Sequence, residues 1–178
     1  MVSVLKNARI EPYRASSRAF SDLNWLTSYR SFNFPNYYSP DYEHFGPIRI
    51  LNEDNVAPSS GFPMHSHRDA EIFSYILSGE LTHRDSTVKK SIGSEDKKLF
   101  YRMWRGDVQF SSAGSGAKHS ENNESPTESV RFLQIWVLPW KKGLSPVYHT
   151  QTFAEEEKRK GFLTIISPLR GGVDATPL

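Results

Sequence analysis

Two of the six histidines in this sequence, His65 and His67, are separated by one residue in the segment GFPMHSHRDAE. In an extended chain, residues two apart point to the same face, so this spacing lets one strand offer two imidazoles to one metal ion. Neutral imidazole is a common ligand of divalent transition metals. The preceding Pro63 favours an extended approach to that face. A lone His-x-His pair also arises by chance on protein surfaces, so the interpretation needs further ligands.

A second pair of candidate ligands lies in the segment GSGAKHSE. His119 and Glu121 are also two residues apart, and they share a face if this segment is extended. Three imidazoles and one carboxylate suit iron(II), manganese, nickel, copper or zinc, and leave one or two positions for water, substrate or dioxygen. Glu71 competes with Glu121 as the carboxylate ligand, because it follows His67 by four residues and has the same parity.

The other histidines have simpler interpretations. We expect His44, His83 and His149 to be surface or hydrogen-bonded residues without a role in metal binding. Asp69 directly follows Arg68, which favours a local ion pair or a turn contact over a metal ligand.

Composition excludes several classes of site. The chain of 178 residues contains no cysteine, so it has no disulfide, no thiolate metal site and no cysteine nucleophile. Its net charge of +2 is too small to indicate nucleic-acid binding. No apolar run approaches the roughly 20 residues of a membrane-spanning helix. We therefore expect no direct partner among nucleic acids and no membrane insertion.

Short segments rich in β-branched and aromatic residues lie between frequent glycines and prolines, which predicts many short strands. The expected strands are Gly46–Asp54, two strands within Glu71–Ser86 that meet near Ser78, two strands within Lys98–Gly114 around a turn at Gly106, and Val130–Pro139. Strands of this length and spacing are typical of an all-β sandwich or barrel.

One helix is expected, from Thr152 to Gly161. Thr152 could be its N-cap, with Glu155 three residues later in a capping box, and Gly161 could end it. The segment is so polar that the helix is expected on the surface.

The longer motifs resemble the pirin family of the cupin superfamily. The resemblance is carried by FGPIRILNEDNVAPSSGFPMHSHRDAEIFSYILSGELTHRDS, GDVQFSSAGSGAKHSE and RFLQIWVLPWKKGLSPVY, and it extends from about Trp25 to Ser167. It implies an all-β cupin jelly roll with little helix. We accordingly expect an N-terminal extension over residues 1–24, a cupin domain over 25–168 and a tail over 169–178, without the second cupin that pirins carry.

The resemblance also implies a ligand set and an activity. His65, His67, His119 and Glu121 would bind iron, usually Fe(II), and Glu71 would lie beside them without binding the metal. The implied activity is that of a quercetin 2,3-dioxygenase acting on a flavonol-like substrate, in which Glu121 could also accept a phenolic proton. The alternative is a non-enzymatic, iron-dependent and redox-responsive coregulator that binds a transcription factor.

The resemblance has two further consequences. Family members of these kinds imply a cytoplasmic or nuclear location. A pirin-like cupin without its second domain is expected to expose apolar surface and to self-associate or bind a partner. The aromatic-rich segments Ser28–Phe45 and Trp136–Leu144 are the expected carriers of that surface.

Overall fold

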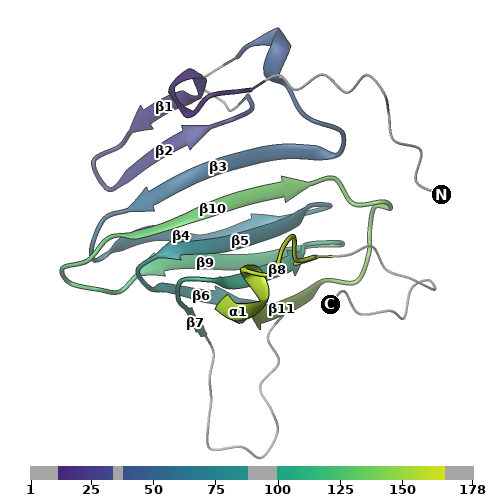
Figure 1. Cartoon of the computed structure of the whole chain (residues 1–178). Helices are drawn as coiled ribbons and strands as arrows, with labels where there is room; N and C mark the ends of the chain where they lie inside the picture. The colour runs from purple at the N-terminus through teal and green to yellow at the C-terminus, as the bar shows by residue number, and fades with distance from the viewer. Residues whose placement is uncertain (1–11, 34–37, 88–99, 167–178) are drawn as a thin grey trace, which may run out of the picture.

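The computed structural model of the chain describes residues 12–33, 38–87 and 100–166 (Figure 1). These residues form eleven strands: β1 (Ala19–Asp22), β2 (Leu26–Arg30), β3 (Ile48–Val56), β4 (Ser60–His67), β5 (Glu71–Ser78), β6 (Leu81–Asp85), β7 (Tyr101–Met103), β8 (Asp107–Ser112), β9 (Ala117–Asn123), β10 (Val130–Val137) and β11 (Val147–Thr152). Helical structure within the described ranges is limited to the α-helix α1 (Glu155–Lys158) and the 3-10 turns η1 (Ala15–Ser17) and η2 (Pro40–Tyr42).

The strands are arranged in two antiparallel sheets. The larger has the order β1-β2-β3-β10-β5-β8-β11, and the smaller has the order β4-β9-β6-β7. Figure 1 shows the smaller sheet behind the larger one, so the two form a sandwich. The expected all-β cupin jelly roll with little helix is therefore confirmed.

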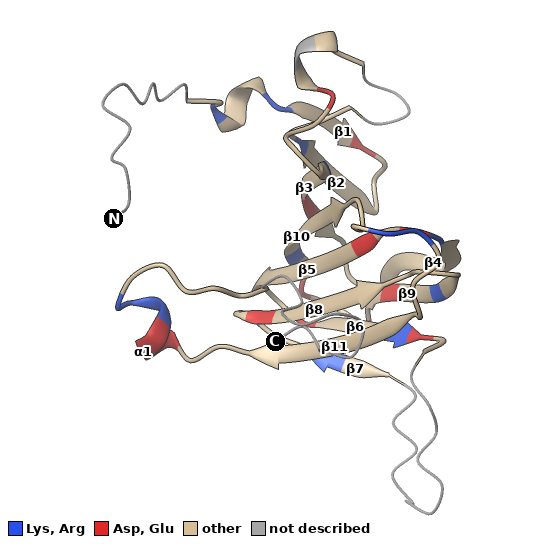
Figure 2. Cartoon of the chain, turned by 90° about the vertical axis from the view of Figure 1, so that its right-hand side faces the viewer, with Lys and Arg blue, Asp and Glu red and all other residues tan. Residues whose placement is uncertain are grey.

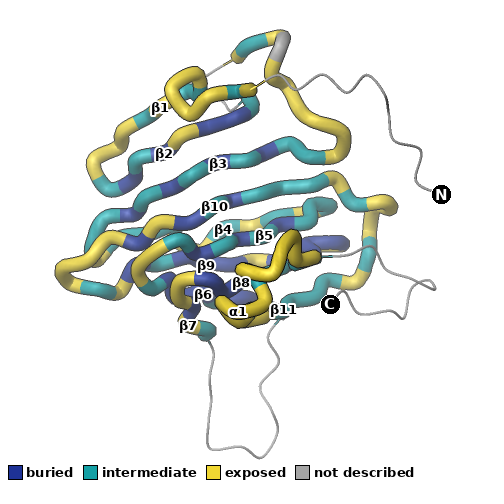
Figure 3. Tube along the Cα trace, in the orientation of Figure 1, coloured by how far each residue is buried: buried dark blue, intermediate teal, exposed yellow. Residues whose placement is uncertain are grey.

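Successive side chains on a strand point to opposite faces, so one set faces the space between the sheets. Figure 3 shows buried, dark blue segments on strands of both sheets. An apolar cluster fills part of this interior and consists of Leu26, Val56, Ile76, Leu81, Met103, Val130 and Phe132. Many other buried side chains are polar, and they include Ser74, His83, Gln109, His119, Glu121 and Gln134. A polar interior of this kind is costly unless its groups are hydrogen-bonded or bind a ligand.

The expected strands are confirmed, but the proposed helix cap is wrong. The α-helix begins at Glu155 with Ala154 as its N-cap. Thr152 instead belongs to β11, where it pairs with Asp107 of β8. Its hydroxyl donates to the Asp107 carboxylate at 2.6 Å, so it is not available to cap a helix.

The domain boundaries at residues 24 and 168 remain predictions. Ala19–Asp22, within the expected N-terminal extension, form the edge strand β1 next to β2. The expected tail over 169–178 lies outside the described residues. Figure 2 shows basic and acidic residues interspersed over the strands in this view. Within the described ranges, no helix is long and apolar enough to cross a membrane.

Candidate metal centre

The histidine-bearing strands β4 and β9 are antiparallel neighbours in the smaller sheet. His65 on β4 pairs directly with His119 on β9. His67, two residues beyond His65, lies on the same side of β4. His65 and His119 are 54 residues apart along the chain. The three imidazoles nevertheless come from one pair of neighbouring strands.

A β-bulge in β4 sets the direction of its two histidines. Phe62 pairs with Glu121, but the next paired residue on β4 is His65, so β4 advances three residues where β9 advances two. The extra residue lies at Pro63 and Met64, where proline cannot donate a ladder hydrogen bond. Without this shift in parity, Phe62 and His65 would point to opposite faces of the sheet.

The three rings form a compact cluster. The ring centroids lie 4.7 Å apart for His65 and His67, and 4.6 Å apart for each of these with His119. One nitrogen from each ring lies within 4.8 Å of the others. Nε2 of His65 and Nε2 of His119 are 3.0 Å apart.

Hydrogen bonds at the far side of two rings fix their orientation. Nδ1 of His65 donates to the Pro63 carbonyl oxygen at 2.7 Å. Nδ1 of His119 lies 3.0 Å from Nε2 of His83. The ring of His67 instead packs edge-on against Trp136, with centroids 4.8 Å apart.

Burial keeps two of these rings neutral at physiological pH. It lowers the pKa of His67 to about 4, with nearby His119 as a smaller cause. It also lowers the pKa of His119 to about 4, followed in size by the effect of His65. A neutral imidazole has one nitrogen lone pair, which is the form that binds metals.

The donor set fits a divalent transition metal. Two imidazole nitrogens at right angles on one ion, each about 2.1 Å from it, are about 3.0 Å apart. The His65 and His119 Nε2 atoms have this separation, which is also a hydrogen-bond distance. Nε2 of His67 is buried and has no hydrogen-bond partner among the described residues. A cation at the cluster would satisfy this nitrogen.

Glu121 reaches from β9 across the interior to the larger sheet. One carboxylate oxygen lies 3.0 Å from the Ser74 hydroxyl, and the other accepts a hydrogen bond from Gln134 at 2.9 Å. The same Ser74 oxygen lies 2.8 Å from the Gln134 carbonyl oxygen. Serine has a single hydroxyl hydrogen, so all three contacts are satisfied together when Glu121 is protonated and donates to Ser74. Burial raises the pKa of Glu121, which favours that form.

The ligand atoms that lie within 4.8 Å of one another come from His65, His67 and His119, and no oxygen of Glu121 belongs to this group. Its role as fourth ligand therefore stays a prediction. The competing carboxylate, Glu71, pairs with Ser112 at the start of β5 and accepts a hydrogen bond from its hydroxyl at 3.0 Å. Along β5, Glu71 points to the same face as half-buried Phe73, whereas buried Ile72 points to the opposite face. Glu71 is thus on the other face of this strand from the interior.

Sequence reasoning missed two buried residues next to the cluster, His83 and Asp85 on β6. Asp85 pairs with His119 and His83 pairs with Glu121 across the β6–β9 ladder. His83, Asp85 and His119 form a second group of possible ligands within 4.8 Å of one another. The signal was present in THRDS, because His83 and Asp85 have the same i, i+2 spacing as the other pairs. The Asp69 carboxylate accepts a hydrogen bond at 2.6 Å from the amide of Gly143, which is 74 residues away, so this contact is not the local ion pair or turn contact that was expected.

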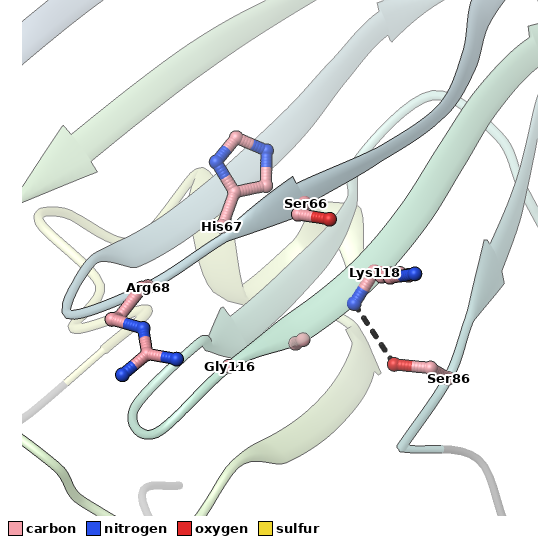
Figure 4. A pocket seen from close by; sticks show the side chains of 7 residues that line it. Ser66, His67, Arg68, Ser86, Gly116 and Lys118 are labelled. Carbon is pink, nitrogen blue, oxygen red and sulfur yellow. Dashed lines mark hydrogen bonds between the residues drawn. The ribbon is translucent and has the colours of Figure 1, made fainter.

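A hollow of about 540 Å³ borders the centre at the β4–β9 end. In Figure 4 the His67 ring points away from this hollow. The Ser86 hydroxyl oxygen accepts a hydrogen bond from the Lys118 backbone amide at 2.9 Å. Its lining residues are Ser66, His67, Arg68, Ser86, Gly116, Ala117 and Lys118, of which Arg68 and Lys118 are cationic. The hollow is large enough for a small aromatic molecule.

Comparison with known proteins gives consistent results. The family model described as Pirin matches residues 13–137. A protein of Pasteurella multocida, provisionally named a quercetin 2,3-dioxygenase, is 43% identical over 146 residues, covering 82% of this chain and 57% of that protein. The quercetin 2,3-dioxygenase of Escherichia coli is 34% identical over 155 residues, covering 87% of this chain and 62% of that protein.

A solved structure agrees with these matches. The bacterial pirin YhhW from Escherichia coli, in complex with nickel(II), superposes with a TM-score of 0.70 at 36% identity, covering 79% of this chain and 57% of that one. The chain thus spans about three fifths of the length of the curated relatives it matches. The family match extends over more than half of the chain and includes every histidine of the cluster, so this chain belongs to the Pirin family.

Proposed function

We propose that the chain binds one divalent transition metal ion, Fe(II), through His65, His67, His119 and Glu121. We propose further that it catalyses dioxygenation of a flavonol-like substrate, as a quercetin 2,3-dioxygenase does. The observation that carries this proposal is the cluster of three imidazoles with two Nε2 atoms 3.0 Å apart. The quercetin 2,3-dioxygenase names of relatives and the nickel(II) complex of YhhW support it.

The protein's own contribution is to hold the ligands in place. The Pro63 carbonyl orients His65, and Trp136 packs on His67, so these rings are positioned before a metal ion binds. When bound, the metal ion supplies the Lewis-acid and redox chemistry that dioxygenation requires. Glu121 must give up its proton to bind a cation, and the Gln134 amide remains a donor to its carboxylate.

Glu121 is also proposed as the catalytic base. Burial raises the pKa of Glu121, so its carboxylate, when detached from the metal, is a stronger base than an exposed glutamate and suits removal of a phenolic proton. Gln134 and Ser74 hold the carboxylate in one orientation from the opposite sheet. The coregulator alternative, with its transcription-factor partner and nuclear location, is supported by no observation on the described residues.

The test uses the full chain, purified without oxygen and loaded separately with Fe(II), Ni(II) or Mn(II). We expect oxygen uptake that depends on quercetin, accompanied by loss of the flavonol absorbance, with at least one of these metals. His65→Ala and His67→Ala should abolish both signals. His44→Ala is the matched control, because His44 is exposed and lies outside the cluster.

Two results would contradict the proposal. Quercetin turnover that survives in both cluster variants would place the activity elsewhere. A metal-loaded wild-type chain that consumes no oxygen with quercetin would refute the dioxygenase assignment for this chain, while its metal content would still report on the binding site.

A further inference from the structure

His83 is a fully buried imidazole next to the candidate metal centre and has no part in the proposed ligand set. It is 0% exposed on β6. Its Nε2 lies 3.0 Å from Nδ1 of His119. Its ring is stacked on Tyr148 of β11, with centroids 5.0 Å apart and planes at 19°. The ring is thus fixed from one side by stacking and aimed at a single neighbour.

The hydrogen bonds around the cluster restrict where protons can lie. Nδ1 of His65 must carry hydrogen, because it faces the Pro63 carbonyl oxygen at 2.7 Å, so Nε2 of His65 has the lone pair. His119 has two choices when neutral. Its hydrogen is either on Nε2, facing His65, or on Nδ1, facing His83. Only the second choice leaves lone pairs on both Nε2 atoms for a cation.

We propose that His83 is a positioning residue that accepts the Nδ1 hydrogen of His119 and thereby holds His119 in its metal-binding tautomer and orientation. This inference rests on the metal site proposed above. A metal-bound imidazole commonly donates its other N–H to a neighbouring acceptor, which fixes the ring and raises the basicity of the ligand. For His119 the structure offers His83 Nε2 in that place. His83 then carries its own hydrogen on Nδ1, a buried atom with no hydrogen-bond partner among the described residues.

A second cation between His83, Asp85 and His119 is the competing explanation for this group. Asp85 is already satisfied without one. Its carboxylate accepts hydrogen bonds from the Thr87 amide at 2.8 Å, the Thr87 hydroxyl at 2.6 Å and the Ser111 hydroxyl at 3.3 Å. The hydrogen-bond interpretation therefore accounts for the burial of Asp85 as well as for the contact between the two histidines.

Two variants of similar size separate the effect of the hydrogen-bond acceptor from the effect of side-chain volume. In His83→Gln the amide oxygen can lie near the position of Nε2 and accept the His119 hydrogen. His83→Met fills the space but provides only a weak acceptor. Nickel(II) affinity of the full apo chain is measured by competition with a chromogenic chelator. We expect His83→Met to lose about tenfold to hundredfold in affinity, and His83→Gln to recover most of that loss.

A second measurement does not depend on either variant. In the zinc(II)-loaded wild-type chain, nitrogen and proton NMR should show His119 with hydrogen on Nδ1, protected from exchange. Nickel(II) affinity in His83→Met equal to wild type would overturn the proposal, as would zinc bound at Nδ1 of His119. Binding of two nickel ions per chain would favour the second cation site instead. A wild-type chain that binds neither metal would refute the metal site itself, a result distinct from these.

Discussion

Replacing Gly61 by alanine should weaken metal binding although no proposed ligand is replaced. Gly61 lies on β4 and pairs with Asn122 of β9, on the strand pair that carries the three histidines. A Cβ atom at this position would be 2.3 Å from the Glu121 carbonyl oxygen and 2.6 Å from the Asn122 Cα atom. Both atoms belong to the β9 backbone, so no side-chain rotation can relieve the contact.

The size of the disturbance follows from these distances. Cβ contacts shorter than 3.0 Å are essentially never observed, so β4 and β9 must separate by at least 3.0 − 2.3 = 0.7 Å at this point. Metal ligands generally need to be held to within about 0.5 Å of their positions. Overpacking of this kind costs about 1–3 kcal/mol of folding free energy. We expect nickel(II) affinity to fall by about tenfold or more, because His65 lies on β4 and His119 on β9, the two strands that must separate.

The assay combines nickel(II) titration calorimetry with thermal unfolding of the apo chain. Gly46→Ala is the matched control, since Gly46 has φ +55° and nothing within 4 Å of an added Cβ. It should lower stability through backbone strain alone and leave metal affinity unchanged. If Gly61→Ala loses stability but binds nickel(II) as wild type does, the ligand geometry is independent of this strand spacing and the reasoning is refuted.

Three further outcomes are expected. His67→Ala should lower nickel(II) affinity strongly with an unchanged far-ultraviolet circular dichroism spectrum, because the fold rests on sheet packing; loss of the β signal would contradict this. Burial raises the pKa of Asp54 from 3.8 to about 6, so the folded state holds this proton more tightly than the unfolded state does. The resulting stability is fully present below pH 3.8 and is lost as the pH rises to about 6, and the loss is about 3 kcal/mol for this shift. Urea unfolding of Asp54→Asn at pH 4 and pH 7 should lack that difference relative to wild type, and equal pH dependence would count against the buried carboxyl. Exposed Tyr38, Phe45 and Trp140 are expected to support self-association, and a concentration-independent monomer in sedimentation at micromolar concentrations would exclude it.

Local periodicity was sufficient to predict part of the site. Residues two apart on a strand share a face whatever the fold, so the pairing of His65 with His67 and of His119 with Glu121 required no knowledge of topology. The strand assignments around them were also local, since they followed from β-branched and aromatic runs between turn residues. The helix cap failed for a non-local reason, because the hydroxyl of Thr152 is used by Asp107 on another strand.

The part that sequence reasoning missed depends on which strands are neighbours. Nothing in the segment THRDS shows that β6 lies beside β9, and only this pairing brings His83 to His119. The bulge at Pro63 is a similar case, since parity alone would put Phe62 and His65 on opposite faces. These two features do the same physical task from opposite sides of the cluster: the Pro63 carbonyl fixes the hydrogen of His65, and His83 is placed to fix that of His119. The candidate ligands are thus readable in the sequence, whereas the hydrogen-bond acceptors proposed to prepare them for a cation come into place only when the strands pair.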